Sequence, residues 1–133
     1  MNFSSPIPRI LFLISALCFI SITGYGQKHR YSEKKYADYI QSIMGGDREV
    51  SVPNGRADLV TETHAIEVEF AEKWKNSLGQ SLWYAFQTNK KAGIIIIMES
   101  NDDNKYVIML QSLIEHNELS DKIDLWVFPQ DFD

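Results

Sequence analysis

The sequence predicts an α/β fold in which one mixed sheet is flanked by helices. A turn signal, Pro53-Asn54-Gly55, separates two segments that alternate polar and apolar residues, as the strands of an antiparallel hairpin do. Residues 65–70 (AIEVEF) alternate strictly, and a helical pattern follows them. The unbroken apolar run GIIIIM, which begins at Gly93, is typical of a strand that is covered on both faces.

The periodicity of the whole chain predicts the order αβββαβαβ, an antiparallel hairpin that continues into a parallel part. Helices are expected at 33–44, 72–89 and 106–117, where apolar residues recur at spacings of three and four. Strands are expected at 48–52, 56–62, 65–70, 93–98 and 122–128. Ser32 is the expected N-cap of the first helix, and Gly45-Gly46 is expected to end it.

The first 26 residues have the composition of a secretory signal peptide. Their single charge is Arg9, and the apolar run from Ile10 to Thr23 is shorter than the roughly 20 residues that span a membrane. We expect cleavage before Gln27, which leaves 27–133 as one periplasmic or secreted domain with no stable membrane association. The alternatives are a retained anchor, a lipoprotein attached through Cys18 and an intracellular protein with a misread start codon.

Composition limits the ways in which this domain could act. Hydrophobic residues make up 44% of the chain and charged residues 23%, so it can bury a core. The formal net charge of −5 means that the overall field repels phosphates, so nucleic-acid binding would need a metal ion or a local basic patch. Cys18 is the single cysteine, so the expected mature domain has no disulfide.

Acidic side chains are concentrated on two adjacent predicted strands. Asp58 lies on one of them, and Glu67 and Glu69 share a face of the next strand, roughly 7 Å apart. Hard divalent cations such as Mg²⁺ or Mn²⁺ bind to oxygen ligands of this kind. Acids on a buried strand need a partner, because an unpaired buried charge is costly.

The predicted helix that follows these strands could supply such a partner. Lys73 lies at its start, and Gln80 and Tyr84 lie seven and eleven residues further on the same helical face. A lysine in this position is placed to neutralise the acids, hold a water or stabilise charge that develops on a phosphate.

These residues, in this order of elements, resemble the PD-(D/E)XK nuclease superfamily, which includes restriction endonucleases, Holliday-junction resolvases and RecB-like nucleases. In that family an Asp ends one strand and an acid-X-Lys triplet lies on the next, and Asp58 and Glu67 match the two acids. The third position holds Glu69 instead of lysine. The resemblance implies that the lysine has moved to the following helix, as Lys73 or, less well placed, Lys75.

Two further matches extend the resemblance over about residues 30–100. The string from Gly79 to Tyr84 (GQSLWY) matches the GQxxxY signature of RecB-like members, and Glu33 is the closest match to a metal-holding Glu on the first helix of many members. The resemblance therefore implies the following roles. The catalytic residues are Asp58, Glu67, Glu69 and Lys73, the metal ligands are Asp58, Glu67 and Glu33, and the substrate-positioning residues are Gln80 and Tyr84.

The function implied is that of an exported Mg²⁺- or Mn²⁺-dependent nuclease that hydrolyses phosphodiester bonds of DNA. The alternative is a catalytically degenerate nuclease fold that serves as a binding or structural module, which Glu69 in the lysine position favours. An exported effector that acts on another cell's nucleic acid is a third hypothesis, and a homodimer is compatible with the small size of the domain. The three histidines lack the spacing of a zinc site, and the three tryptophans are expected in or beside the core.

Overall fold

The computed structural model describes residues 28–133. The predicted signal peptide and its cleavage site lie outside the described residues, so export stays a prediction. Between residues 28 and 133, none of the helices combines the length and the apolar character that a membrane crossing requires.

The chain forms a five-stranded mixed sheet and three α-helices in the predicted order αβββαβαβ. The helices are α1 (Glu33–Met44), α2 (Trp74–Thr88) and α3 (Asn104–His116). The strands are β1 (Asp47–Val52), β2 (Gly55–Val60), β3 (His64–Phe70), β4 (Lys91–Ile97) and β5 (Ile123–Phe128). Their spatial order is β1-β2-β3-β4-β5, with antiparallel pairing from β1 to β3 and parallel pairing from β3 to β5.

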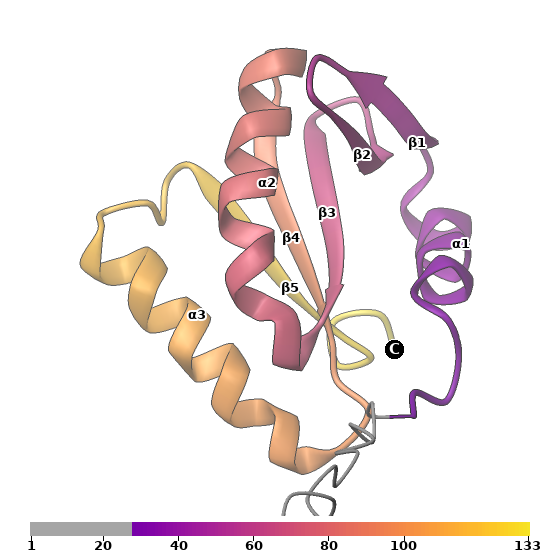
Figure 1. Cartoon of the computed structure of the whole chain (residues 1–133), viewed down its shortest axis with the longest axis vertical. Helices are drawn as coiled ribbons and strands as arrows, with labels where there is room; N and C mark the ends of the chain where they lie inside the picture. Colours follow the sequence, from indigo (N-terminus) through magenta and orange to yellow (C-terminus); the bar gives the residue numbers. More distant parts are fainter. Residues whose placement is uncertain (1–27) are drawn as a thin grey trace, which may run out of the picture.

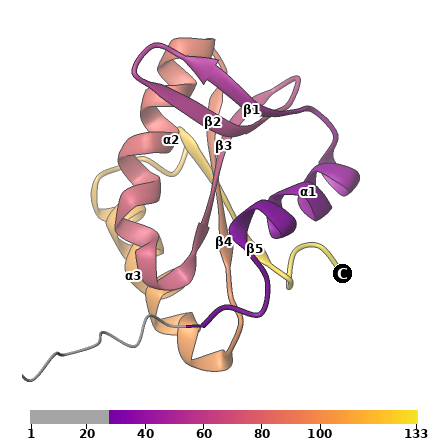
Figure 2. The same ribbon diagram turned by 45° about the vertical axis from the view of Figure 1, so that its right-hand side comes forward.

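Helices cover both faces of the sheet, so the fold has three layers. Figures 1 and 2 show α2 and α3 on one face and α1 on the other. Strand β4 contributes to both cores: Ile94 and Ile96 pack in the cluster with α2 and α3, whereas Ile95 and Ile97 pack in the cluster with α1. The prediction that the apolar run of this strand is covered on both faces is therefore confirmed.

Local signals set most element boundaries. Helix α1 has its predicted bounds, and the Ser32 hydroxyl accepts a hydrogen bond from the Lys35 backbone nitrogen at 3.3 Å. Strand β2 was predicted to reach residue 62 but ends at Val60, because Thr61 and His64 close a tight turn. The Thr61 nitrogen donates to the His64 carbonyl oxygen at 2.9 Å, and the His64 nitrogen donates to the Thr61 hydroxyl at 3.0 Å.

The predicted helix at 72–89 differs from the structure at its start and at one apolar residue that the structure leaves exposed. A 3₁₀ turn, Ala71–Lys73, precedes α2, and Lys73 is the N-cap residue of α2 without a side-chain capping bond. Phe86 is 76% exposed, whereas Leu78, Leu82 and Ala85 pack against the core. The buried face includes Ser77 and Ser81, whose hydroxyls donate to backbone carbonyls one turn back, so their small side chains bring the helix close to the sheet.

Candidate active site

The candidate site lies where β2 and β3 separate. These strands pair at Leu59 with Ile66 and at Val60 with Ala65. One step beyond these pairs, Asp58 Oδ2 accepts a hydrogen bond from the Val68 backbone nitrogen at 2.9 Å. The carboxylate of Asp58 thus takes the place of a backbone acceptor and is fixed against β3.

Strand β3 carries Glu67 and Glu69 on the sheet face opposite to the core residues that pack against α1. Both are nearly enclosed, with 6% and 7% of their surfaces exposed. From α2, the side-chain amide nitrogen of Gln80 is placed to donate to Glu67 Oε1 at 2.7 Å and to the Asn76 carbonyl oxygen at 3.2 Å. Glu33, from the first turn of α1, reaches the same cluster.

The four acids act on one another's pKa as two pairs. Glu67 is paired with Asp58 and Glu69 with Glu33, so that a proton on the glutamate of β3 would bridge each pair. Burial raises the pKa of Glu67 to about 9, and the charge and hydrogen bond of Asp58 add to this shift. Burial likewise raises the pKa of Glu69 to about 7, and the charge of Glu33 adds to it. The protons that Glu67 and Glu69 retain therefore reduce the repulsion between the buried carboxyls, which have little positive charge beside them.

Burial also raises the pKa of the other member of each pair. For Asp58 the shift is opposed by hydrogen bonds from the Val68 backbone and from Glu67. For Glu33 it is opposed by the hydrogen bond from Glu69. Within residues 28–133, Glu67 Oε2 is the one buried side-chain oxygen or nitrogen without a hydrogen-bond donor. An ionised Glu67 would thus leave this oxygen unsatisfied.

Two cations border the cluster, and the sequence patterns predicted one of them. Lys73 is exposed, and its Nζ lies 6.0 Å from the centroid of the Phe70 ring. Its charge opposes the effect of burial on the pKa of Glu69. In residues 28–133, no ion pair within 4.0 Å joins Lys73 to an acid.

The cation that sequence reasoning missed is Arg48, on β1. Its Nη1 donates to the Asp58 backbone carbonyl, and its Nε lies 3.1 Å from Asp38 Oδ1 on α1. The alternation of β1 was the available signal, since Arg48 shares the less exposed face with Val50 and Val52. An arginine at an inward strand position implies a nearby acceptor.

Tyr84, expected to position substrate, is buried with 6% of its surface exposed. Burial raises the pKa of its hydroxyl, and the nearby Arg56 backbone N–H opposes that shift. Its ring lies against Gly55, where an added Cβ would be 2.6 Å from Tyr84 Cε1. These contacts tie α2 to the hairpin, and the substrate-positioning role stays a prediction.

A second network, also missed from the sequence, lies at the end of β3. The His29 ring stacks on Phe70 with centroids 3.5 Å apart and an angle of 7°. Its Nε2 lies 2.9 Å from Glu72 Oε1, and its Nδ1 lies 2.9 Å from Glu99 Oε2. These residues come from distant parts of the chain, and no local pattern indicates their meeting.

The structure therefore brings Glu33, Asp58, Glu67 and Glu69 together, places Gln80 against them and leaves Lys73 at their border. In residues 28–133, no set of three or more His, Cys, Asp or Glu side chains has the geometry that holds a metal ion. The carboxyls are held as two pairs. The predicted catalytic and metal-binding roles stay predictions.

Comparison with curated proteins shows similarity to part of a viral protein. The chain is 33% identical over 75 residues to the protein named "Putative KilA-N domain-containing protein L33" of Acanthamoeba polyphaga mimivirus. The match covers 55% of this chain and 30% of the viral protein, so the chain corresponds to less than a third of it. No protein-family model matches the chain, and no solved structure matches it.

Proposed function

We propose that this protein is a divalent-metal-dependent nuclease that cleaves phosphodiester bonds of DNA. The observation that carries the proposal is the cluster of Glu33, Asp58, Glu67 and Glu69, which draws four carboxyls into an enclosed place with little positive charge. Such a cluster costs folding free energy, because burial and mutual repulsion both oppose ionisation. Binding of a cation would explain why the protein has a cluster that lowers its own stability.

The donor set suits Mg²⁺ or Mn²⁺. It consists of oxygens alone, and Glu67 Oε2 is buried without a donor, so it is available as a ligand. Asp58 and Glu67 would hold the ion, with Glu33 as a third ligand. Loss of the protons shared within the two pairs would free their oxygens, so binding should release protons and strengthen as pH rises.

The arrangement of elements supports the family resemblance. The chain order αβββαβαβ, an Asp where β2 leaves β3, and two acids on β3 are the features on which the PD-(D/E)XK resemblance rests. The GQxxxY string adds Gln80, whose amide is placed to donate to Glu67 and so to orient it. Similarity to a protein named for a KilA-N domain is compatible with a role on DNA.

Each residue of the site would have a separate task in hydrolysis. A bound ion would supply Lewis acidity toward a phosphate oxygen. Gln80 would keep Glu67 Oε1 in place, leaving its second oxygen for the ion. Lys73, exposed at the border of the cluster, would approach the phosphate and offset charge that develops on it. Glu69, paired with Glu33, would accept a proton from the attacking water once ionised.

The remaining expectations belong to the same proposal. The apolar segment from Ile10 to Thr23 supports export to the periplasm or the medium, and N-terminal sequencing of the mature protein would test this. A homodimer would enlarge the contact with DNA, and sedimentation would detect it.

The proposal is tested by cleavage of plasmid and linear DNA with Mg²⁺, with Mn²⁺ and with EDTA. We expect cleavage with either ion and none with EDTA. Asp58→Asn and Glu67→Gln should abolish it, whereas the control Lys122→Ala, at an exposed lysine just before β5, should retain it. Absence of cleavage with both ions, on every form of DNA and RNA supplied, would overturn the nuclease proposal.

A catalytically degenerate module is the second candidate. It is favoured by Glu69 in the position of the motif lysine and by the lack, within residues 28–133, of an ion pair between Lys73 and the cluster. Calorimetric titration with Mn²⁺ separates the two candidates. Binding that Glu67→Gln removes, together with absence of turnover, would favour the degenerate module.

A further inference from the structure

A pocket of about 660 Å³ opens beside α1, at the carboxyl ends of β4 and β5. Ligands of open α/β sheets commonly bind in crevices outside the carboxyl ends of the strands. The volume lies within the range of about 300–1,000 Å³ that is usual for small-ligand sites. We call this site the α1–β5 pocket, and none of the four clustered acids lines it.

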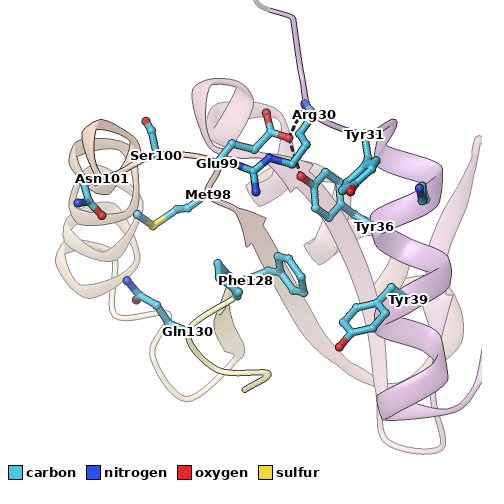
Figure 3. Close-up of a pocket in the computed structure, with 12 residues that line it drawn as sticks. Arg30, Tyr31, Tyr36, Tyr39, Met98, Glu99, Ser100, Asn101, Phe128 and Gln130 are labelled. Atoms are coloured by element: carbon cyan, nitrogen blue, oxygen red, sulfur yellow. Dashed lines mark hydrogen bonds between the residues drawn. The ribbon is translucent and has the colours of Figure 1, made fainter.

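One wall of the α1–β5 pocket is aromatic. Tyr31, Tyr36, Phe128 and Tyr39 form a chain of edge-to-face contacts, with centroids 5.8, 5.5 and 5.9 Å apart in that order. Figure 3 shows the three tyrosines on the α1 side of the pocket and Phe128 between them and Gln130. Tyr31 and Tyr39 are 46% and 54% exposed, so an incoming planar group can reach their rings. Such rings stack on nucleic-acid bases of any sequence.

The lining also carries positive charge. Arg30 and Lys35 line the pocket, and Lys35 Nζ lies 3.9 Å from the centroid of the Tyr31 ring. The one acid in the lining, Glu99, is occupied by hydrogen bonds from the Tyr36 hydroxyl at 2.6 Å, the Arg30 backbone nitrogen at 2.8 Å and the His29 ring. With two cations and one carboxylate, the lining is locally positive in a chain of formal net charge −5, which favours a phosphate.

Side-chain amides complete the lining opposite the aromatic wall. Asn101 and Gln130 reach the pocket from the turns that follow β4 and β5 (Figure 3). Amides of this kind can donate to and accept from the edge of a base. Rings for stacking, cations for phosphate and amides for base edges together match a nucleotide better than a purely apolar ligand.

The α1–β5 pocket and the acid cluster share helix α1. Glu33, in the cluster, and Tyr36, in the pocket, are three residues apart, which corresponds to roughly one helical turn. The His29 network, through Glu99 and Phe70, connects the pocket to the end of β3. A strand that passes the acid cluster could therefore place a neighbouring nucleotide in the pocket.

We propose that the α1–β5 pocket receives an unpaired nucleotide, with its base against the tyrosines and its phosphate near Arg30 and Lys35, so that the protein selects single-stranded DNA or unpaired strand ends. This inference rests on the proposed function and names the substrate class of that site. A paired base cannot enter such a pocket without leaving the duplex, which costs free energy of unpairing and unstacking.

The test is fluorescence anisotropy of the full-length protein with a labelled ten-nucleotide oligothymidylate and a labelled ten-base-pair duplex, in EDTA to prevent cleavage. We expect the single strand to bind at least about tenfold more tightly than the duplex. Tyr39→Ala should weaken single-strand binding about tenfold, and Tyr39→Phe, which keeps the ring, should restore it. Lys35→Ala should weaken binding and lower the slope of log affinity against log salt by about 0.7.

Matched controls use exposed residues outside the pocket. Lys34→Ala removes the same charge from the same helix, and Phe86→Ala removes an aromatic ring that is 76% exposed on α2. Neither change should alter binding as the Lys35 and Tyr39 changes do. Equal binding of single strand and duplex, or equal effects of the pocket variants and their controls, would overturn the inference.

The same measurements separate failure of the inference from failure of the proposed function. Metal-dependent cleavage with binding that does not depend on Tyr39 or Lys35 would reject the pocket and keep the nuclease. Single-strand binding that depends on both residues, with no cleavage under any metal condition, would reject the nuclease and keep the pocket as a single-strand site.

Discussion

Replacement of Glu67 by glutamine should stabilise the protein at alkaline pH, although it removes a carboxyl that we propose to be essential. The folded-state pKa of Glu67 is raised to about 9 and that of Glu69 to about 7, from an ordinary value of 4.5. The folded chain thus keeps protons that the unfolded chain releases. The stabilisation that these protons give is complete below the unfolded-state pKa of 4.5. It is lost as pH rises through about 7 for Glu69 and then about 9 for Glu67.

The magnitude follows from the protons involved. Each proton held only in the folded state changes the free energy of unfolding by about 1.4 kcal/mol per pH unit. For Glu67 this gives a ceiling of roughly 5 kcal/mol at pH 8, which coupling to Asp58 and entry of water reduce. We expect Glu67→Gln to gain about 2 kcal/mol at pH 8, a rise in Tm of roughly 8 °C or more. At pH 5 the gain should be close to zero.

The assay is thermal unfolding, followed by circular dichroism, of the wild-type protein and Glu67→Gln in EDTA from pH 5 to pH 9. The substituted glutamine would retain an oxygen that accepts from Gln80 and an amide that donates to Asp58, so it imitates the protonated form of Glu67. Glu62→Gln, at an exposed glutamate beyond β2, is the control and should give a difference that does not vary with pH. A wild-type Tm that is constant from pH 5 to pH 9, or a variant that is less stable throughout, would refute the reasoning.

Three further changes should alter stability or cleavage. At pH 8, Mn²⁺ at 100 times its Kd should stabilise the wild-type protein by about 2.7 kcal/mol and Glu67→Gln by much less. Thermal shift would measure both effects, and equal shifts would reject the metal site. Lys73→Ala should lower the cleavage rate roughly 100-fold with little change in Tm, whereas equal loss in Lys75→Ala would remove any special role of Lys73. Gly55→Ala should destabilise the fold by about 1–3 kcal/mol, because its Cβ would meet Tyr84 Cε1 at 2.6 Å, and urea unfolding that shows no loss would contradict this packing.

Local patterns predicted the elements well because helix and strand periods are properties of neighbouring residues. The cap at Ser32 and the turn at Asn54, whose φ is 59°, marked boundaries for the same reason. The prediction failed where tertiary packing chose between faces of a helix. Ser77 and Ser81 of α2 are buried beside the apolar residues that pack against the core, and Phe86 is left exposed.

In the candidate site, too, local patterns predicted some residues and tertiary packing placed the others. Strict alternation in β3 was enough to place Glu67 and Glu69 on one face, and a strand pairing placed Asp58 beside them. The pairing of Glu69 with Glu33 depends on where α1 lies across the sheet, and no pattern within α1 specifies it. Arg48 was missed although the alternation of β1 placed it on the less exposed face, because its acceptor, the Asp58 carbonyl, lies on another strand.

The sequence by itself determined the order of elements, the hairpin and the acids of the central strand, because each depends on residues a few positions apart. Only the tertiary structure decided which carboxyls share protons and that Tyr84 packs against the hairpin. It also formed the aromatic, basic pocket beside α1. These features depend on burial and on distances between segments up to about a hundred residues apart, such as Tyr31 and Phe128. Desolvation and close packing act through space, and only the folded chain brings such segments within their range.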